Sequence, residues 1–306
     1  MGGSGPGSVV VPGNHDGVHA GHQALLARAR VLAGERLEVV ALTFDPHPMA
    51  TVAPERAPVP LTTIARRTEL LRAAGADRVD VARFDAAYAS QSADAWITNE
   101  LAGRLGARAV VVGVDFRFGK GRDGDLAGLR EMGARRGIDV EALGEVMLAG
   151  TSERVSSTAV RTAVAAGDVA HAALLLTRPH SVDGTVVEGD KRGRAIGFPT
   201  ANLVADPVLL PRDGVYAVRA RTSEGRWVEG VANLGTRPTF AAGRSLEAHL
   251  FDFAGDLYGA RLRLAFVARI RDEQKFEGVD ALVAQIRRDV DRARAALART
   301  PRGAEG

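Results

Sequence analysis

The sequence predicts an α/β protein in which a doubly wound parallel sheet precedes a small antiparallel β-barrel and a terminal helix. Three observations support this fold class. Strand-like and helical patterns alternate from residue 9 to about residue 176, short strands between glycine turns follow, and an amphipathic helical pattern ends the series. The length of 306 residues suits two domains. We expect a flexible leader over 1–8, one domain over 9–178 and a second domain over 179–300.

The alternating region contains five apolar runs of the strand type, with helical patterns between and after them. The runs are Val9–Val11, Leu37–Phe44, Arg78–Phe84, Ala109–Val114 and Ile138–Val146. The helical patterns are His22–Leu32, Thr63–Ala74, Ser92–Leu105 (with Ser92 as its N-cap), Leu126–Arg135, Ser157–Ala166 and Val169–Leu176. Such alternation predicts a parallel sheet with helices on both faces, and ligands of these sheets bind at the carboxyl ends of the strands.

A second periodicity begins after Thr177-Arg178-Pro179, which breaks the helical pattern. The short strand patterns are Thr185–Val187, Val215–Ala220, Trp227–Ala232, Leu246–Phe251 and Arg261–Ile270. In the last of them the alternation predicts one apolar face made of Leu262, Leu264, Phe266, Ala268 and Ile270. Several such strands in series indicate a small barrel. We expect the helix Val279–Leu297 to pack on the barrel through the stripe Leu282, Ile286, Val290, Ala293 and Leu297.

Composition excludes several classes of function. Hydrophobic residues make up 46% and charged residues 25% of the chain, which is typical of a globular protein. A net charge of +3 is too small to indicate nucleic-acid binding. The absence of cysteine excludes disulfides, thiolate catalysis and cysteine-bound metals. With no apolar run of membrane-spanning length and no signal region, we expect a soluble cytoplasmic protein with small-molecule partners and no membrane partner. Self-association stays open.

The strongest chemical signal joins the first strand to the first helix and reads GNHDGVHAGH, residues 13–22. Backbone N–H groups at a helix start favour a phosphate. His19 and His22 lie three residues apart and would project to one side, where they could stabilise charge on an α-phosphate. The alternatives are a metal pair or a helix-capping histidine. The stretch predicts a nucleotidyl-transfer site, whose cofactor-binding candidates in this loop are Gly13, Asn14, Asp16 and Gly21.

Three further loops of the first domain contain candidate binding residues. The loop from Phe44 through Pro46 and His47 to Pro48 is either a rigid turn or a wall for a planar ligand. Asp115 could hold a ribose hydroxyl or a base edge, or be a solvated loop residue. The segment with Ser156, Ser157, Thr158 and Arg161 suits a triphosphate tail, although capping by Ser157 is an adequate structural account.

The second domain has its own constellation. A glycine loop with basic residues runs from Gly184 to Arg194 and is either an ATP-binding loop or a wetted turn. Thr200 and Asn202, on a loop set by Pro199, are oxygen donors suited to Mg²⁺. Glu247 faces away from Leu246, Ala248 and Leu250; if its side lines an enclosed site, its pKa would rise and it could accept a proton from a substrate hydroxyl. The alternative is an exposed acid paired with Arg244.

Taken together, these segments closely resemble the prokaryotic bifunctional riboflavin kinase/FMN adenylyltransferase family, also called FAD synthetases. The resemblance extends from Val9 to about Leu297 and depends on the order of its motifs, since no single motif would suffice. The motifs are GNHDGVHAGH, TFDPHP, VVGVDFRFG, VSSTAVR, GRAIGFPTAN, NLGTRPTF, EAHLFDFAGDLYG and KFEGVDALVAQI.

The resemblance implies that the first domain adenylylates FMN and that the second phosphorylates riboflavin. ATP, riboflavin and FMN would be substrates, FAD the product and Mg²⁺ the metal. In the first domain it implies that His19 and His22 act on ATP and that Asp115 binds the nucleoside. Phosphates would be bound by Ser156, Ser157, Thr158 and Arg161. The flavin would be bordered by Phe44, Pro46, His47 and Pro48. In the second it implies an ATP-covering loop from Lys191 to Arg194, Mg²⁺ binding by Thr200 and Asn202, and Glu247 as the base. Gly184, Gly193, Gly197 and Pro199 complete the cofactor-binding candidates.

Two residues depart from the family pattern. The family usually has phenylalanine where this chain has His15, and a basic residue where it has Ala20. One alternative is therefore a riboflavin kinase with a weakened adenylyltransferase domain. A second alternative, of another class, is a flavin- or RNA-binding module without catalysis, which only the small barrel favours because aromatic residues make up just 5% of the chain.

Overall fold

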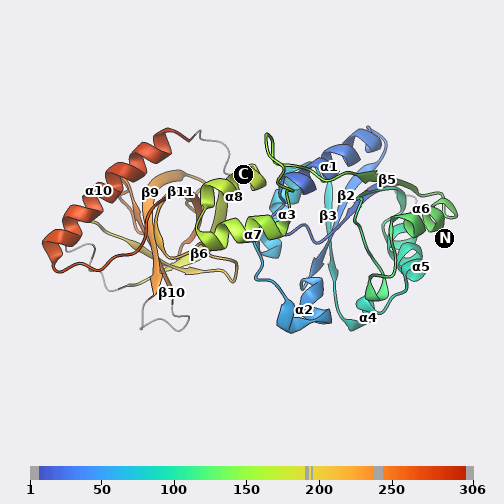
Figure 1. Cartoon of the computed structure of the whole chain (residues 1–306), viewed down its shortest axis with the longest axis horizontal. Coiled ribbons are helices and arrows are strands. Elements are labelled where there is room, and N and C mark those ends of the chain that lie inside the picture. The colour runs from blue at the N-terminus through green and yellow to red at the C-terminus, as the bar shows by residue number, and fades with distance from the viewer. Residues whose placement is uncertain (1–6, 190–192, 194–195, 237–243, 301–306) are drawn as a thin grey trace. The chain divides into compact units, whose positions relative to one another are not determined.

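The computed structural model describes residues 7–189, 193, 196–236 and 244–300. The chain divides into two compact units, the first ending at Ser157 and the second beginning at Thr158 (Figure 1). Two helices, α7 (Ser157–Ala166) and α8 (Val169–Leu176), therefore group with the barrel by their contacts. Val169 of α8 packs into the barrel core, which explains this grouping. The predicted border between domains at 178–179 stays a prediction.

The first unit contains a five-stranded parallel sheet with strand order β3-β2-β1-β4-β5. Its strands are β1 (Ser8–Pro12), β2 (Glu38–Asp45), β3 (Arg78–Arg83), β4 (Ala107–Gly113) and β5 (Asp139–Leu143). The chain starts at the centre of the sheet, moves to one edge and then crosses to the other. The predicted doubly wound architecture is confirmed, and the carboxyl ends of β1, β4 and β5 lie beside one another.

Helices cover both faces of this sheet because alternate residues of its strands point to opposite sides. Val9 and Val11 of β1 join a core with α1 (Ala20–Ala33) and α3 (Ile64–Ala73), whereas Val10 joins a core with the helices on the other face. Those helices are α5 (Ala93–Trp96), its wider continuation η2 (Ile97–Arg104) and α6 (Leu126–Ala134). The predicted N-cap is confirmed, since Ser92 accepts a hydrogen bond from the backbone of Ala95. The short helices are α2 (Pro48–Val52), η1 (Pro54–Arg56), α4 (Ala86–Ala89) and η3 (Lys120–Arg122).

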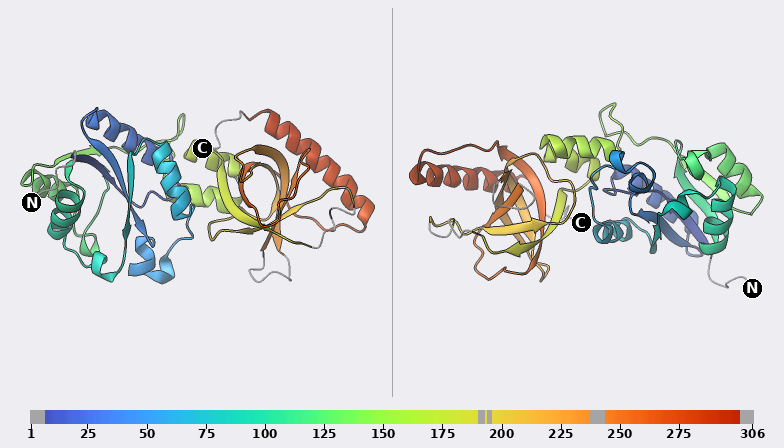
Figure 2. Two further views of the ribbon diagram at one scale, coloured as in Figure 1. Left: turned by 180° about the vertical axis from the view of Figure 1, so that it is seen from behind. Right: turned by 90° about the horizontal axis from the view of Figure 1, so that it is seen from below.

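The second unit is a closed barrel of six antiparallel strands in the order β10-β7-β6-β11-β8-β9 (Figure 2). The strands are β6 (His180–Val187), β7 (Ala201–Ala205), β8 (Gly214–Arg221), β9 (Trp227–Thr236), β10 (Arg244–Leu250) and β11 (Arg261–Arg271). The predicted barrel is confirmed. The sequence pattern missed β7, since the expected loop around Asn202 is a strand paired with both β6 and β10.

The prediction of a single apolar face along β11 is wrong. Leu262, Leu264 and Phe266 do line the barrel core, but Ala268 and Ile270 pack in the cluster that faces the terminal helix. Register shifts occur between Phe266 and Ala268 and again between Arg269 and Arg271. A bulge of this kind inserts an extra residue and turns the following side chains to the other face.

The terminal helix α10 (Val279–Ala298) runs along the outside of the barrel (Figure 2). Ala293 and Leu297 are buried against it and Val290 is partly buried, so the predicted stripe holds over the second half of the helix. On the N-terminal side of Val290, Gln285 and Asp289 are buried polar residues. Asp289 forms a forked ion pair with Arg271 of β11 at 2.7–3.0 Å, so a charged contact joins the middle of the helix to the barrel.

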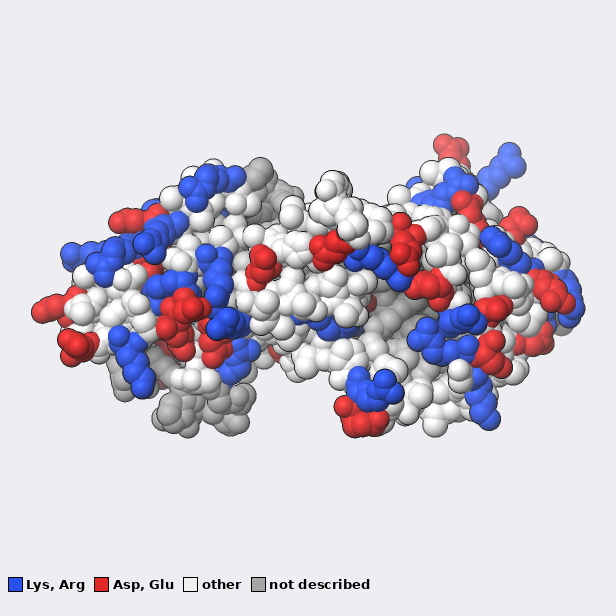
Figure 3. Space-filling view, viewed as in Figure 1, with Lys and Arg blue, Asp and Glu red and all other residues white. Residues whose placement is uncertain are grey.

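Acidic and basic side chains are interspersed on the face of the molecule shown in Figure 3. Many acidic and basic side chains of the described residues form ion pairs; Arg104, for example, lies 2.6 Å from both Asp80 and Glu100. Pairs this exposed typically contribute about 0–1 kcal/mol each. Among the helices that the structure describes, none has the length and apolar character needed to cross a membrane.

Candidate active sites

The loop after β1 forms one wall of a pocket of about 220 Å³ at the carboxyl ends of the strands. The loops after β1 and β4 meet at this edge, because the lining includes residues from both. Candidates that line the pocket are Gly13, His19, Gly21, His22, Asp115 and Ser156; His15, Leu25, Glu145 and Arg154 line it as well. The pocket is therefore the candidate adenylyltransferase site.

Three imidazole rings gather in this pocket. The rings of His19 and His22 are stacked, with centroids 3.7 Å apart, as their spacing on the first helical turn predicts. The third ring, that of His15, meets the ring of His22 edge-on: their centroids are 4.9 Å apart and the angle between the ring planes is 81°. Among the residues the structure describes, no group of three or more His, Cys, Asp or Glu side chains could hold a metal ion. The arrangement suits stabilisation of a phosphate.

His15 is neutral at physiological pH. Burial, with 1% of the residue exposed, lowers the pKa of its imidazole to about 4; a hydrogen bond with Val11 opposes this, and the charge of Arg67 adds to it. Nε2 lies 3.0 Å from the carbonyl oxygen of Val11 and must carry the proton, because a carbonyl only accepts. The ring packs against Gly13, where an added Cβ would lie 2.9 Å from its Cε1.

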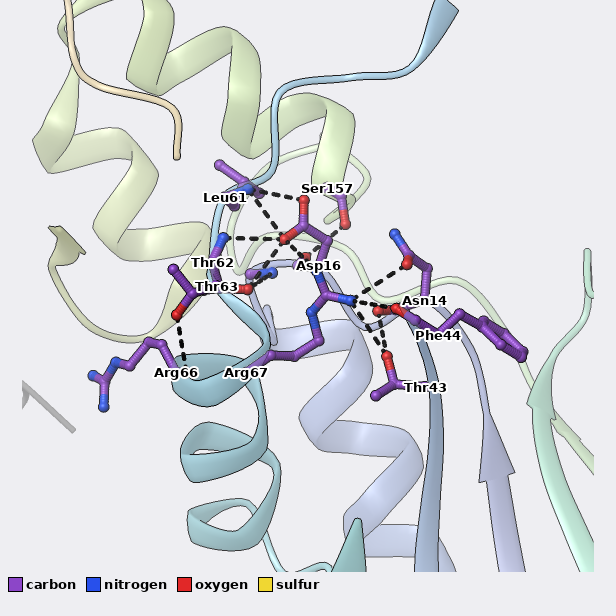
Figure 4. A network of polar contacts seen from close by, with 11 residues as sticks. Asn14, Asp16, Thr43, Phe44, Leu61, Thr62, Thr63, Arg66, Arg67 and Ser157 are labelled. Carbon is purple, nitrogen blue, oxygen red and sulfur yellow. Dashed lines mark hydrogen bonds and ion pairs between the residues drawn. The ribbon is translucent and has the colours of Figure 1, made fainter. Parts of the chain in front are cut away.

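Asp16 is fully buried and its carboxylate binds other parts of the first unit (Figure 4). The backbone N–H groups of Leu61 and Thr62 donate to it at 2.9–3.1 Å, and Arg67 forms an ion pair with it at 3.3 Å. Asp16 was a cofactor-binding candidate. These contacts support a different proposal, in which Asp16 holds the loop in place while neighbouring residues meet the nucleotide.

Asp115 is on the rim of the pocket and forms an ion pair with Arg154 at 2.5 Å. The hydrogen bond from this guanidinium lowers the pKa of the carboxyl. Arg154 also pairs with Glu145 at 2.8 Å, and all three residues line the pocket. The sequence reading missed Arg154, although a basic residue two positions before the Ser156–Thr158 hydroxyls was the available signal.

The hydroxyl-rich segment contributes to the same loop. Ser157 is the first residue of α7 and donates its hydroxyl to the carbonyl oxygen of Asp16 at 2.8 Å (Figure 4). This contact joins the start of α7 to the loop after β1, and capping of the helix by Ser157 stays a prediction. Thr158 and Arg161 follow on α7 and group with the second unit. Their role at a phosphate stays a prediction.

The segment expected to border the flavin follows β2. Phe44 packs edge-on against Phe84 and Tyr88, with ring centroids 5.4 and 5.8 Å away. The Nδ1 atom of His47 accepts a hydrogen bond from the backbone of Met49, which caps α2, and Pro48 is the first residue of that helix. The peptide bond before Pro46 is cis. These contacts account for a rigid turn; the flavin border stays a prediction.

The candidate kinase site lies on the outer face of the barrel strands. In the register of the sheet, Glu247 of β10 is directly opposite Asn202 of β7 on one side and Asn233 of β9 on the other. Leu246, Ala248 and Leu250 point into the core, so Glu247 faces outward, as predicted. The alternative prediction, that Glu247 pairs with Arg244, is wrong. Arg244 pairs with Asp213 instead, and its Nε lies 2.9 Å from a carboxylate oxygen of Asp213. Asn233 was not among the candidates.

Asn202 has the properties of a metal ligand. The residue is 8% exposed, and its amide oxygen is buried with no hydrogen-bond partner among the described residues. The close approach of Gly189 encloses it, since a Cβ there would lie 2.2 Å from its amide nitrogen. Buried polar atoms are rarely left unpaired. An unpaired amide oxygen two residues from the Thr200 hydroxyl fits a hard cation such as Mg²⁺.

A second pocket, of about 560 Å³, opens beside Thr200. It is lined by Val186, Pro199, Thr200, Ala201, Ala248, Leu250 and the segment 253–258, which includes Tyr258. The candidate Gly184 is packed within the barrel, since a Cβ there would lie 2.8 Å from the carbonyl oxygen of Val204. Gly197 has a φ of +87°, in the region that favours glycine, and Gly193 lies close to the backbone of Phe198. Lys191 and Arg194 lie outside the described residues.

Comparisons with known proteins match a different family model to each part of the chain. A family model described as FAD synthetase matches residues 4–159, and one described as riboflavin kinase matches residues 176–297. Three similar curated relatives are all bifunctional riboflavin kinase/FMN adenylyltransferases. The protein of Escherichia coli K12 is 42% identical over 92% of this chain and 90% of its own; that of Pseudomonas fluorescens is 43% identical over 95% and 94%; that of Bacillus subtilis is 36% identical over 92% and 90%.

A solved structure described as a macrolide-efflux protein from Streptococcus pneumoniae is also similar. It is 30% identical, covers 95% of both chains and has a TM-score of 0.85. Its description differs from those of the two family models and the three relatives above, which agree with one another and together account for both units. On that evidence the chain belongs to the family of bifunctional riboflavin kinases/FMN adenylyltransferases.

Proposed function

We propose that this chain phosphorylates riboflavin to FMN in its barrel unit and adenylylates FMN to FAD in its first unit. The observation that carries the proposal is the pair of separate sites, each in the unit that the corresponding family model matches. ATP is a substrate of both reactions, but a different phosphorus is attacked in each.

In the first unit, a phosphate oxygen of FMN attacks the α-phosphorus of ATP. The bond from this phosphorus to the oxygen that bridges it to the β-phosphate breaks, and pyrophosphate leaves. His19 and His22 stabilise the charge that develops on the α-phosphate, which is where electrostatic catalysis acts in phosphoryl transfer. Ser156 and the rim residue Arg154 are the proposed contacts for the other phosphates, with Asp115 at the nucleoside.

In the barrel unit, Glu247 removes the proton from the 5′-hydroxyl of riboflavin, and the hydroxyl oxygen attacks the γ-phosphorus of ATP. The bond between this phosphorus and the β–γ bridging oxygen breaks, and ADP leaves. Thr200 and Asn202 are the proposed Mg²⁺ ligands; the ion, when bound, would neutralise charge on the phosphates. The pocket beside Thr200 is the proposed binding site of ATP, and its volume is in the range typical of ligand sites. Tyr258, which lines it, is available to contact the adenine ring.

A product assay tests the proposal. Purified protein incubated with riboflavin, ATP and Mg²⁺ should form FMN and then FAD, separated by chromatography. Folded protein that forms neither product would refute it. We place both reactions in the cytoplasm, and self-association can be measured on the same preparation by sedimentation.

A second candidate function is a riboflavin kinase with a weakened adenylyltransferase. The observation that favours it is His15, an ionisable ring buried beside His22 in the nucleotide pocket. This candidate predicts that FMN accumulates without FAD and that His15→Phe raises the rate of FAD formation. A rapid conversion of FMN to FAD by the unaltered chain would argue against it.

A further inference from the structure

We propose that Arg67 is a positioning residue of the adenylyltransferase. It fixes the loop between β1 and α1 (residues 13–19, here called the ATP loop) to the proposed flavin border after β2, and thereby sets the geometry of attack. The inference rests on the proposed function of the first unit. Arg67 lies on the first turns of α3 and was not among the candidate site residues; neither it nor any other residue of α3 lines the nucleotide pocket.

The guanidinium of Arg67 reaches both loops at once (Figure 4). On the ATP-loop side, Nη2 lies 3.3 Å from a carboxylate oxygen of Asp16, and Nη1 lies 3.5 Å from the amide oxygen of Asn14. On the flavin side, the same Nη1 lies 3.4 Å from the hydroxyl of Thr43 and 3.4 Å from the carbonyl oxygen of Phe44. One side chain therefore spans the ends of β1 and β2.

This contact is built into the interior rather than added at the surface. Arg67 is 3% exposed and Asp16 is fully buried. A buried guanidinium needs several acceptors arranged around its planar fork, and a lysine cannot supply the same directions. The hydroxyl of Thr43 also donates to the carbonyl oxygen of Asn14 at 2.8 Å, so the two loops are joined directly beneath the fork.

The ATP loop needs such an anchor because of its backbone. His15 and Val18 have φ values of +51° and +43°, a region that is unfavourable for a β-branched residue such as Val18. Conformations of this kind persist only where surrounding contacts enforce them. Asp16 lies between these two residues, so its bonds to Arg67, Leu61 and Thr62 supply the enforcement.

The chemistry depends on the same loop, because His19 and His22 begin the helix that follows it. A displacement of Asp16 relative to Phe44 would change the distance between the α-phosphate and the attacking phosphate of FMN. Misplacement by about 1 Å can reduce a rate by about 100-fold. Loss of the fork should therefore reduce turnover more than it reduces binding of either substrate.

The test compares Arg67→Lys with Arg66→Lys in the full chain. Arg66 is the adjacent buried arginine of α3 and forms its ion pair with Glu69 of the same helix at 3.0 Å. We expect Arg67→Lys to lower kcat for FAD formation by about 100-fold while the KM values for ATP and FMN change by less than about threefold. Arg66→Lys should keep most of the rate. FMN formation by the barrel unit is the internal control for the amount of intact chain, and the fluorescence of Trp96 in a Trp227→Phe background reports the folding of the first unit.

A second variant keeps the inference testable if Arg67→Lys does not fold. Thr43→Val removes one acceptor of the fork together with the hydrogen bond from the Thr43 hydroxyl to Asn14, and it leaves the Asp16–Arg67 pair intact. We expect a fall in kcat of about tenfold. Where Arg67→Lys does fold, adding Thr43→Val to it should cause no further fall, because both changes break the same connection between the two loops.

Each outcome decides the matter. A normal rate of FAD formation by Arg67→Lys would overturn the inference, as would an equal loss of rate in Arg66→Lys or KM values that rise as much as kcat falls. If the unaltered chain forms FMN but no FAD, the proposed adenylyltransferase function fails and this inference fails with it. These results are distinguishable because the unaltered chain is measured beside the variants.

Discussion

The two candidate sites are assembled in different ways. In the first unit, the ATP loop has two non-glycine residues in the left-handed region and is held by contacts from α3, which is about 50 residues away in sequence. In the barrel, Asn202, Glu247 and Asn233 are neighbours because three strands pair in register, and the ladder itself places them side by side.

This difference has a physical consequence. A β-ladder is maintained by many backbone hydrogen bonds, so a change at one outward side chain leaves the positions of its neighbours almost unchanged. The ATP loop is maintained by a few buried polar contacts, and losing one of them affects the rest. We therefore expect substitutions in the row Asn202–Glu247–Asn233 to act on one chemical step. Substitutions around the ATP loop should also change how the substrates are positioned.

The largest expected effect is that of Glu247→Gln. The amide keeps the shape of the side chain but cannot take the proton of the 5′-hydroxyl, so FMN formation should fall by about 1,000-fold. FAD formation from supplied FMN should continue at its normal rate, because the sites are separate. Chromatographic assay of both products checks this; a loss of FAD formation from supplied FMN would contradict the independence of the two units.

His19→Ala should have the opposite selectivity. Removing one of two stacked imidazoles at the α-phosphate should lower FAD formation by about 100- to 1,000-fold, while FMN accumulates normally from riboflavin. The matched control is Val31→Ala, since Val31 lies on the exposed side of α1 with 68% of the residue exposed. Retention of FAD formation in His19→Ala would place the charge-stabilising groups elsewhere in the pocket.

The stability of the first unit should respond to acid through His15. Burial lowers the pKa of His15 from 6.5 to about 4. Between these values the unfolded chain binds a proton that the folded chain does not, so the contribution of His15 to stability is fully present above pH 6.5 and declines as the pH falls toward 4. A shift of this size corresponds to about 3 kcal/mol.

The measurement is urea unfolding at several pH values in a Trp227→Phe background. Trp96, which is buried in the core of the first unit, is then the sole tryptophan. His15→Phe should unfold with a flatter dependence between pH 6.5 and 4 than the parent. Identical slopes in the two proteins would mean that the imidazole of His15 titrates normally in the folded state.

The sequence was sufficient where local patterns decide the structure. The order of strand, glycine loop and helix predicted the loop between β1 and α1, the three-residue spacing predicted that His19 and His22 lie together, and Ser92 was recognised as a cap. Alternation around Glu247 also predicted that it faces away from the core. Each of these depends on residues within one or two turns of one another.

The sequence was insufficient where distant segments decide. Asp16 reads as a loop carboxylate until α3 brings Arg67 against it, and β7 reads as a loop because its pairing with β6 and β10 is not encoded in its own five residues. The bulge in β11 is likewise a product of the closure of the barrel. Sequence periodicity carries no information about contacts between segments that lie this far apart in the chain.

The smallest expected effect concerns the metal and sharpens the view of the barrel site as a rigid row. Asn202→Ala removes the buried amide oxygen that is the proposed Mg²⁺ ligand while leaving the strand paired. The rate of FMN formation at saturating Mg²⁺ should fall only modestly, and the Mg²⁺ concentration needed for half of that rate should rise by about tenfold, in line with the loss of one ligand contact.

Val204→Ala, two residues further on the same outer face of β7, is the matched control and should leave the Mg²⁺ dependence unchanged. An unchanged Mg²⁺ dependence in Asn202→Ala would show that the unpaired amide oxygen serves another partner, and the row Asn202–Glu247–Asn233 would then be a substrate-binding surface rather than a metal site.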